Sequence, residues 1–232
     1  GAEFMEDMKK IGVALIGAGT IGKGVAELLS RNGKIIEARS RVKVQLTHVC
    51  DKDKTALDAI ADMPGLVKTA DYKEIINSKD VDIVVELIGG LDPAKNIIEE
   101  ALKNKKHVVT ANKKMIAEHL EEIFFLQQQY DRSVLYEGAV CGSIPILRNL
   151  EEYYDNDLLT GIEGIFNGST NYILTKVFEE KKGYEEALKQ AQELGFAESD
   201  PRLDVQAFDP KFKLTIAIAH AFGVFVKPEN II

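Results

Sequence analysis

The stretch IGVALIGAGTIG, residues 11–22, decides the fold. Ile11–Ile16 is a short apolar run that predicts a buried strand, and Gly17, Gly19 and Gly22 follow it at the spacing G-x-G-x-x-G. Apolar residues at helical spacing come directly after the last glycine. The first glycine permits a tight turn, the second lets the backbone approach a phosphate, and the third lets the helix pack closely on the strand. The stretch therefore predicts a strand, a phosphate-binding turn and a helix.

Strand and helix signals alternate through the first half of the chain. One helix is expected to start with Asp92 as its N-cap and Pro93 as its first residue. Strands that alternate with helices predict an α/β fold, a doubly wound parallel sheet of the Rossmann type, here over residues 11–136. The expected strands are 11–16, 42–50, 81–87, 107–110 and 133–136, and the expected helices include 92–104 and 113–130.

The pattern changes after about Glu137 and predicts a second domain over residues 137–232. Residues 158–166 have a strand pattern among several helical segments, which indicates an α+β domain. Residues 1–10 are a lead segment, in which Gly1–Phe4 ahead of Met5 are typical of a cloning remnant. One helix of the second domain is expected to start at residue 142, and three more are expected over 170–180, 184–194 and 210–222.

Composition narrows the class of protein. The net charge of −8 argues against a nucleic-acid or anionic-membrane partner, and 45% hydrophobic with 28% charged residues is typical of a globular protein. No apolar run approaches the roughly 18 residues of a membrane span. Cys50 and Cys141 have no CxxC spacing, so we expect no disulfide framework. We therefore expect a cytoplasmic protein with no membrane or nucleic-acid partner.

The glycine turn predicts a dinucleotide site. Its helix N-terminus attracts the negative charge of a pyrophosphate. Asp51, after the second strand, is the candidate partner of the ribose, because a carboxylate accepts hydrogen bonds from hydroxyls and repels a 2′-phosphate. The adjacent Lys52 and Lys54 could instead hold that phosphate, and Asp51 could also be a solvated turn residue. The turn residues expected to contact the cofactor are Gly17, Gly19, Thr20, Ile21 and Gly22.

Two further segments follow the expected strands, where doubly wound sheets bind ligands. Ile88 and Gly89 come after the run 81–87, and Thr110 precedes Lys113 after the next strand. We expect Ile88, Gly89, Thr110 and Lys113 to line the cofactor cleft. The alternative for Lys113 is a solvent-exposed lysine that follows Asn112 as a helix N-cap.

An acidic loop precedes a helix that is apolar on nearly all sides. Glu198, Asp204 and Asp209 are interleaved with apolar residues, and Lys213 lies one helical turn after Asp209. A lysine in a buried helix is unfavourable unless it is paired, and its proton affinity can be tuned by burial and by the carboxylate. Reduction of a carbonyl by hydride needs a proton donor, which Lys213 could provide. The alternative is a structural ion pair with Asp209 as N-cap.

Five motifs in this order resemble the homoserine dehydrogenase family. The resemblance covers residues 11 to about 224 and is most specific in the last three motifs. The motifs are GAGTIG at 17–22, TANKK at 110–114, YEGAVCGSIP at 136–145, GIFNGSTNYIL at 164–174 and GFAESDP at 195–201.

The resemblance implies an NAD(P)-dependent oxidoreductase that interconverts aspartate 4-semialdehyde and homoserine, on the route to threonine and methionine. It implies that Lys213 and Asp209 are catalytic, and that Glu198, Asp204 and Lys113 bind the substrate. It also implies a homodimer formed through the second domain. The family's site for a monovalent, sodium-like cation, built from backbone oxygens, would fall at Glu137, Val140, Gly142 and Ile144.

Two departures from the family pattern affect these expectations. Family members continue well beyond residue 232, so we expect an incomplete second domain without an amino-acid-binding regulatory module. Cys50 stands where many relatives have arginine, which weakens the case for NADP. Two alternatives stay open: a non-catalytic dinucleotide-binding fragment, and a related dehydrogenase that acts on another small amino acid.

Overall fold

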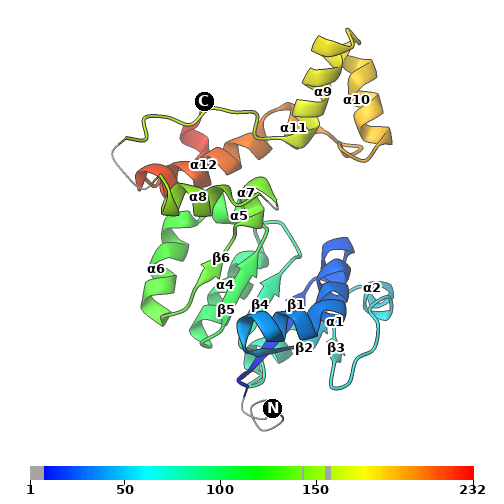
Figure 1. The fold of residues 1–232 in the computed structure, drawn as a ribbon, viewed down its shortest axis with the longest axis vertical. Coiled ribbons are helices and arrows are strands. Elements are labelled where there is room, and N and C mark those ends of the chain that lie inside the picture. Colours follow the sequence, from blue (N-terminus) through cyan, green and yellow to red (C-terminus); the bar gives the residue numbers. More distant parts are fainter. Residues whose placement is uncertain (1–7, 143, 155–157) are drawn as a thin grey trace. The chain divides into compact units, whose positions relative to one another are not determined.

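A computed structural model of the protein describes residues 8–142, 144–154 and 158–232. The chain divides into two compact units. Unit 1 runs to Met115 and resumes over Glu121–Tyr136. Unit 2 comprises Ile116–Leu120 and Glu137–Ile232. Figure 1 shows the parallel sheet of unit 1 and the helices of unit 2.

Unit 1 is built on a six-stranded sheet with the order β3-β2-β1-β4-β5-β6. Every adjacent pair of strands is parallel. This order is that of the Rossmann fold, with the first strand at the centre, and it confirms the expected doubly wound sheet. The strands are β1 (Lys10–Ile16), β2 (Lys43–Cys50), β3 (Val67–Thr69), β4 (Ile83–Glu86), β5 (His107–Thr110) and β6 (Val134–Leu135).

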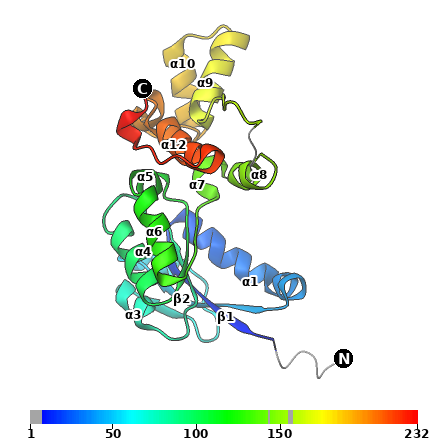
Figure 2. The same cartoon turned by 90° about the vertical axis from the view of Figure 1, so that its left-hand side faces the viewer.

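Helices cover both faces of this sheet. Figure 2 shows α1 on one face and α3, α4 and α6 on the other. The central strands are buried on both sides, which explains why their sequences are continuous apolar runs instead of alternating ones. The helices that belong wholly or partly to unit 1 are α1 (Thr20–Ser40), α2 (Lys54–Asp58), α3 (Tyr72–Asn77), α4 (Ala94–Lys103), α5 (Lys113–Glu118) and α6 (Leu120–Tyr130).

Two local expectations for unit 1 were wrong, and one strand was missed. The strand β3 was not expected, because three residues are too few to show a periodic pattern. The single helix expected over 113–130 is divided into α5 and α6 at His119. The helix expected from Pro93 begins at Ala94, with Pro93 as its N-cap.

Unit 2 consists of helices in the part of the chain that the structure describes. Helices α9 and α10 pack through small residues, and Ala187 and Ala191 of α10 are fully buried. Helix α12 contacts α7 and α8. The elements are α7 (Gly138–Cys141), α8 (Ile146–Glu152), α9 (Gly168–Glu179), α10 (Tyr184–Glu193), α11 (Arg202–Val205), α12 (Phe208–Phe222) and the 3-10 turn η2 (Pro228–Asn230).

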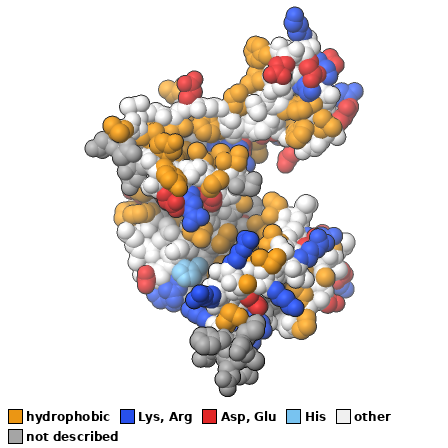
Figure 3. Space-filling model, viewed as in Figure 1, with side chains coloured by type: hydrophobic (Ala, Val, Ile, Leu, Met, Phe, Trp, Pro, Cys, Tyr) orange, Lys and Arg blue, Asp and Glu red, His pale blue; other side chains and the backbone are white. Residues whose placement is uncertain are grey.

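The strand expected over residues 158–166 is absent, so that expectation was wrong. The segment is irregular because no other segment of unit 2, over its described residues, offers a strand edge to pair with. Consequently the expected α+β character is not seen there either. Several apolar side chains of unit 2 are exposed, including Leu158 at 86% and Phe178 at 76%. Figure 3 shows such hydrophobic side chains at the surface.

None of the described helices combines the length and the apolar composition that crossing a membrane requires.

Candidate active site

The glycine turn of unit 1 is held tightly between two strands. Gly17 has φ of +114°, which favours glycine, and its N–H donates to the carbonyl of Cys50 at 2.8 Å. A Cβ on Gly17 would lie 2.9 Å from the backbone of Leu87, and a Cβ on Gly22 would lie 2.1 Å from the carbonyl oxygen of Gly17. The first and third glycines of the motif are therefore required by close backbone contacts.

The middle of the turn is open. A Cβ on Gly19 would meet no atom within 4 Å, and Thr20 and Ile21 are exposed. Gly19 is the N-cap of α1 and has no side chain that could cap the helix. The first N–H groups of a helix attract anions. The turn thus fits a dinucleotide pyrophosphate over Gly19.

Asp51 links the end of β2 to this turn. Its Oδ2 accepts a hydrogen bond from the N–H of Ala18 at 2.8 Å, and its Oδ1 accepts one from Asp53 at 2.9 Å. A carboxylate has about four lone-pair sites, so two remain for ribose hydroxyls. Lys52 and Lys54 are exposed beside it. Asp51 is therefore more than a solvated turn residue.

Cys50 is buried at the end of β2. Burial, with the adjacent Asp51, raises the pKa of its thiol to about 11, so the thiol is neutral at pH 7. Cys50 fills space beneath the turn and has no charge with which to meet a phosphate.

The segments that follow β4 and β5 contain the other residues that we expect at the cofactor site. Ile88 and Gly89 are exposed, and Gly89 has φ of +71°. Thr110 is buried, and its hydroxyl donates to Glu86 at 2.6 Å and accepts from the N–H of Asn112 at 3.0 Å. The Thr110 side chain therefore serves the protein's own structure.

Lys113 is the first residue of α5 and is half-buried. Asn112 caps this helix, because its Oδ1 accepts from the N–H of Met115 at 3.2 Å. The capping role that was the alternative reading of Asn112 is thus present. Lys113 itself is half-buried, unlike the solvent-exposed lysine of that alternative.

Unit 2 brings two of the expected residues, Asp204 and Asp209, together around one amide. Asn167 is buried, and its Nδ2 donates to Asp204 at 2.7 Å and to Asp209 at 2.8 Å. Its Oδ1 accepts from the N–H of Thr170 at 2.7 Å and so caps α9. The fixed amide holds two carboxylates at one place even though like charges repel.

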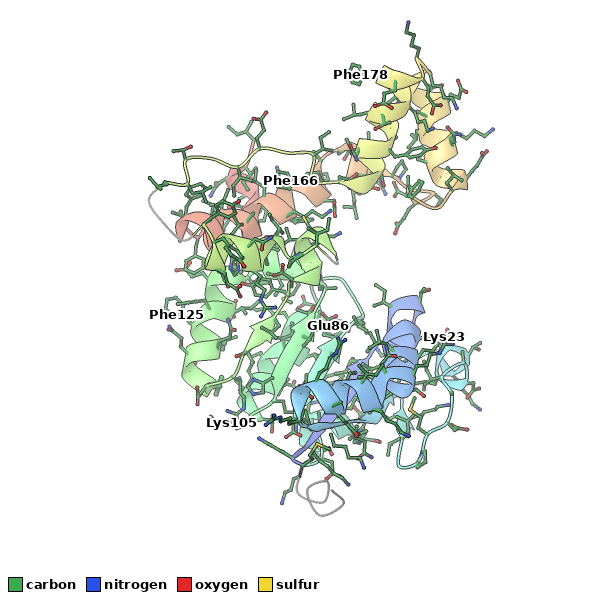
Figure 4. All side chains as sticks on the ribbon, viewed as in Figure 1. Lys23, Glu86, Lys105, Phe125, Phe166 and Phe178 are labelled. Atoms are coloured by element: carbon green, nitrogen blue, oxygen red, sulfur yellow. The ribbon has the colours of Figure 1, made fainter. Side chains whose placement is uncertain are left out.

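Lys213 completes this cluster. Its Nζ lies 2.7 Å from Asp209 Oδ2, and the two side chains are 14% and 8% exposed. Nζ also donates to the carbonyl of Phe166 at 2.7 Å, and Figure 4 labels Phe166 in the segment beside α12. An ammonium has three donors, so one remains for a ligand. The position of Lys213 beside Asp209 suits a proton donor.

The alternative interpretation placed Asp209 at the N-cap of α12, and that detail is wrong. Asp209 lies in the first turn of α12 and is not its N-cap, because the helix begins at Phe208 after Ala207 with φ of +62°. Glu198 is exposed, and no hydrogen bond or ion pair joins it to Asn167, Asp209 or Lys213 among the described residues.

The four residues expected to hold a cation lie in α7 or within three residues of its ends. The carbonyl of Glu137 accepts from Val140 at 3.3 Å, and that of Ile144 accepts from Ile146 at 2.9 Å. Gly142 has φ of +58°, and Ser143 lies outside the described residues. Among the described residues, no group of three or more His, Cys, Asp and Glu side chains is placed to hold a metal. A cation here would depend on backbone oxygens alone.

Sequence reasoning missed two residues. Asn167 was available in the stretch NGST, where an asparagine before a helix predicts a cap but not a bridge between acids. Glu86 is an acid inside the β-branched run 81–87, and a single charge among buried residues is a signal that could have been used.

Comparison with known proteins identifies the family. Residues 17–137 match the family model for the homoserine dehydrogenase NAD-binding domain, and residues 145–232 match the model for homoserine dehydrogenase. The homoserine dehydrogenase of Bacillus subtilis is 40% identical over 97% of this chain and 52% of that protein, and that of Neisseria gonorrhoeae is 40% identical over 93% and 49%. The chain therefore spans about half the length of these curated relatives.

Solved structures agree. A homoserine dehydrogenase from Thiobacillus denitrificans has a TM-score of 0.88 and 38% identity over 96% of this chain and 51% of that chain. A putative homoserine dehydrogenase from Archaeoglobus fulgidus has a TM-score of 0.77 and 34% identity over 95% of this chain and 71% of that chain. Because the NAD-binding model alone covers residues 17–137, the chain belongs to the homoserine dehydrogenase family.

Proposed function

We propose that the full-length protein interconverts L-aspartate 4-semialdehyde and L-homoserine with NAD or NADP. The observation that carries this proposal is the cluster of Lys213, Asp209, Asn167 and Asp204, which combines a paired ammonium with a second carboxylate. Glu198, in the loop that precedes α11, and Lys113, the first residue of α5, are further charged residues that we propose to bind a zwitterionic substrate.

The dinucleotide supplies or accepts the hydride when it is bound. Gly17, Gly19 and Gly22, with Thr20 and Ile21, would hold its pyrophosphate at the open N-terminus of α1. Asp51 would accept hydrogen bonds from its ribose. Ile88 and Gly89 are exposed after β4, and Thr110 would contribute through its backbone since its hydroxyl is already bonded.

Lys213 would give a proton to the carbonyl oxygen of the semialdehyde as that oxygen gains negative charge. In the reverse direction the same amine would take the proton from the hydroxyl of homoserine. Asp209 keeps Nζ in place at 2.7 Å and balances its charge. Asp204 and Glu198 would accept hydrogen bonds from the substrate's ammonium and hydroxyl groups, and Lys113 would be a further substrate-binding residue.

Two further features belong to this proposal. A monovalent cation would be held by backbone oxygens of Glu137, Val140, Gly142 and Ile144, the segment around α7. A homodimer would form through unit 2, whose exposed side chains include Phe178 and Leu194. Covering such apolar surface is favourable in proportion to its area.

The decisive experiment is oxidation of L-homoserine by the full-length protein, followed as absorbance at 340 nm with NAD and with NADP. Turnover that depends on both substrates is the expected result. No turnover of homoserine by a folded, dinucleotide-binding protein would contradict the proposal. The alternative for the 232-residue chain, a dinucleotide-binding fragment without turnover, is tested by the same assay beside a binding measurement.

A further inference from the structure

Glu86 is a fully buried carboxylate at the carboxyl end of β4. Its relative exposure is 0%, and no lysine or arginine of the described residues forms an ion pair with it. Figure 4 labels Glu86 on the sheet of unit 1. An unpaired charge in the protein interior is strongly unfavourable unless hydrogen bonds compensate it. The neighbouring residues of the strand, Val84 and Val85, are apolar and buried.

Three donors compensate the charge. Glu86 Oε1 accepts from the N–H groups of Ile88 at 3.0 Å and Gly89 at 3.2 Å. Glu86 Oε2 accepts from the hydroxyl of Thr110 at 2.6 Å. The carboxylate therefore joins the turn after β4 to the end of β5.

These bonds belong to a closed circuit. The Thr110 oxygen accepts from the N–H of Asn112 at 3.0 Å, and Asn112 Nδ2 donates to the carbonyl of Gly90 at 2.6 Å. Gly90 is next to Gly89, whose N–H returns to Glu86. Both segments that follow the central strands are thus tied to one another through side chains, with Glu86 as the common acceptor.

Lys113 directly follows the last residue of this circuit, Asn112, along the chain. Asn112 Oδ1 caps α5 through the N–H of Met115 at 3.2 Å. We infer that Glu86 is a positioning residue, which sets the turn 88–90 and the start of α5 so that Lys113 is held just after the carboxyl end of β5. This inference rests on the proposed function, because the role of Lys113 comes from it.

The charge of Glu86 fixes the direction of the circuit. A carboxylate can only accept, so the Thr110 hydroxyl must donate to it and is left to accept from Asn112. Glu86→Gln leaves the side-chain volume almost unchanged, but an amide N–H would face the Thr110 hydroxyl. The hydroxyl would then accept this hydrogen bond instead of donating it. An unmet donor within such a network is unfavourable, so the change should spread to Asn112.

The test uses hydrogen exchange in the 232-residue chain and turnover in the full-length enzyme. Glu86→Gln should speed exchange of the amides of both Gly89 and Met115. In the full-length enzyme it should lower kcat by about tenfold to a hundredfold, because small misplacements of reacting groups have effects of this size. The dissociation constant for the dinucleotide should change less than kcat does, because the glycine turn 17–22 is untouched and only the segments that contain Ile88, Gly89 and Thr110 are affected.

Matched variants separate positioning from general stability. Thr110→Val should reproduce the effects of Glu86→Gln, and the double variant should lose no more than the worse single variant. Thr110→Ser keeps the hydroxyl, so it should retain the slow exchange of the Gly89 and Met115 amides. Thr47→Val removes another buried hydroxyl, which donates to the carbonyl of Val13 at 3.3 Å on β1. It should lower Tm and leave kcat unchanged.

Each outcome decides the inference. Unchanged kcat in both Glu86→Gln and Thr110→Val, or faster exchange at Gly89 without Met115, would overturn it. If Glu86→Gln does not fold, the two Thr110 variants decide. If the wild type does not oxidise homoserine, the proposed function fails by itself, and the exchange of Met115 still decides whether the circuit exists.

Discussion

Lys213 and Asp209 form an ion pair with a 2.7 Å separation one turn apart in α12. Because both side chains are largely buried, removal of either charge takes away the ion-pair partner of the other, which is unfavourable in the interior. Mutation of this pair should therefore change the stability of unit 2 as well as its chemistry, so the stability of each variant must be measured beside its activity.

The first prediction concerns Lys213→Ala in the full-length protein. We expect kcat to fall by about 10²–10⁴-fold, the usual contribution of a general acid, with dinucleotide affinity unchanged. Lys211→Ala is the matched control, because Lys211 lies on another face of the same helix, over the ring of Phe208. Steady-state kinetics and dinucleotide titration make the comparison. Near wild-type kcat in Lys213→Ala would remove the catalytic assignment.

The second prediction concerns the acids of the substrate site. Asp204→Asn and Glu198→Gln should raise KM for homoserine, because a hydrogen bond to a charged group contributes about 1.5–3 kcal/mol, which is roughly tenfold or more. Asp204→Asn should have the larger effect, since Asp204 also accepts from Asn167 at 2.7 Å. Glu193→Gln, an exposed acid just upstream, is the control. Unchanged KM in both variants would show that the acidic loop over 198–204 is a solvated surface segment that does not bind the substrate.

Much of unit 1 could be predicted from sequence because local signals and tertiary packing agree there. The glycines of 17–22 and the apolar run of β1 each permit few structures, and a parallel sheet requires its central strands to be apolar. Residues 158–166 show the opposite case. Their pattern suits a strand, but a strand needs a partner, and the described part of unit 2 has none.

The residues of the candidate sites also differ in how well the sequence predicts them. Lys213 could be predicted because a lysine one turn after an aspartate in an apolar helix is unusual. Asn167 could not, because its two acid partners lie 37 and 42 residues away and only the fold brings them to it. Glu86 stood out by its burial, which sequence reports only indirectly.

The third prediction concerns cofactor choice. Asp51 should repel a 2′-phosphate, and the neutral thiol of Cys50 offers no compensating charge, so we expect a modest preference for NAD. Asp51→Asn should shift the ratio of kcat/KM toward NADP by about tenfold, which is about 1.4 kcal/mol. Asp53→Asn, which alters the cap of α2, is the control. An advantage of about tenfold for NADP in the wild type would reverse the assignment.

The fourth prediction concerns acid stability. The ring nitrogen Nδ1 of His107 accepts from the N–H of Ser133 at 3.0 Å, so it must be unprotonated there. Partial desolvation, with the nearby Arg132, lowers the pKa of His107 below its usual value of 6.5. Because the folded-state pKa is the lower one, this bond contributes stability above pH 6.5 that is lost as the pH falls through the folded-state pKa.

Urea unfolding at pH 7.5 and pH 5.5, with NMR titration of the ring, tests this. His107→Asn keeps an acceptor that does not titrate, so the pH dependence of its unfolding free energy should be smaller than that of the wild type. Equal pH dependence in the two proteins, or a ring pKa above 6.5, would show that His107 does not contribute.

The last prediction concerns residues 159–166 in the 232-residue chain. Among the described residues, no amide of this segment donates a hydrogen bond. Those of β4 are paired in the middle of a six-stranded sheet. Amides without partners exchange rapidly, whereas those in a central strand exchange only with larger openings. We therefore expect slow exchange in β4, fast exchange over 159–166, and poor turnover of homoserine by this chain. In a protein of the relatives' full length we expect slower exchange over 159–166, because a strand needs a pairing partner and additional residues can supply one. Slow exchange over 159–166 in the 232-residue chain, together with full activity, would show that unit 2 needs no additional strand.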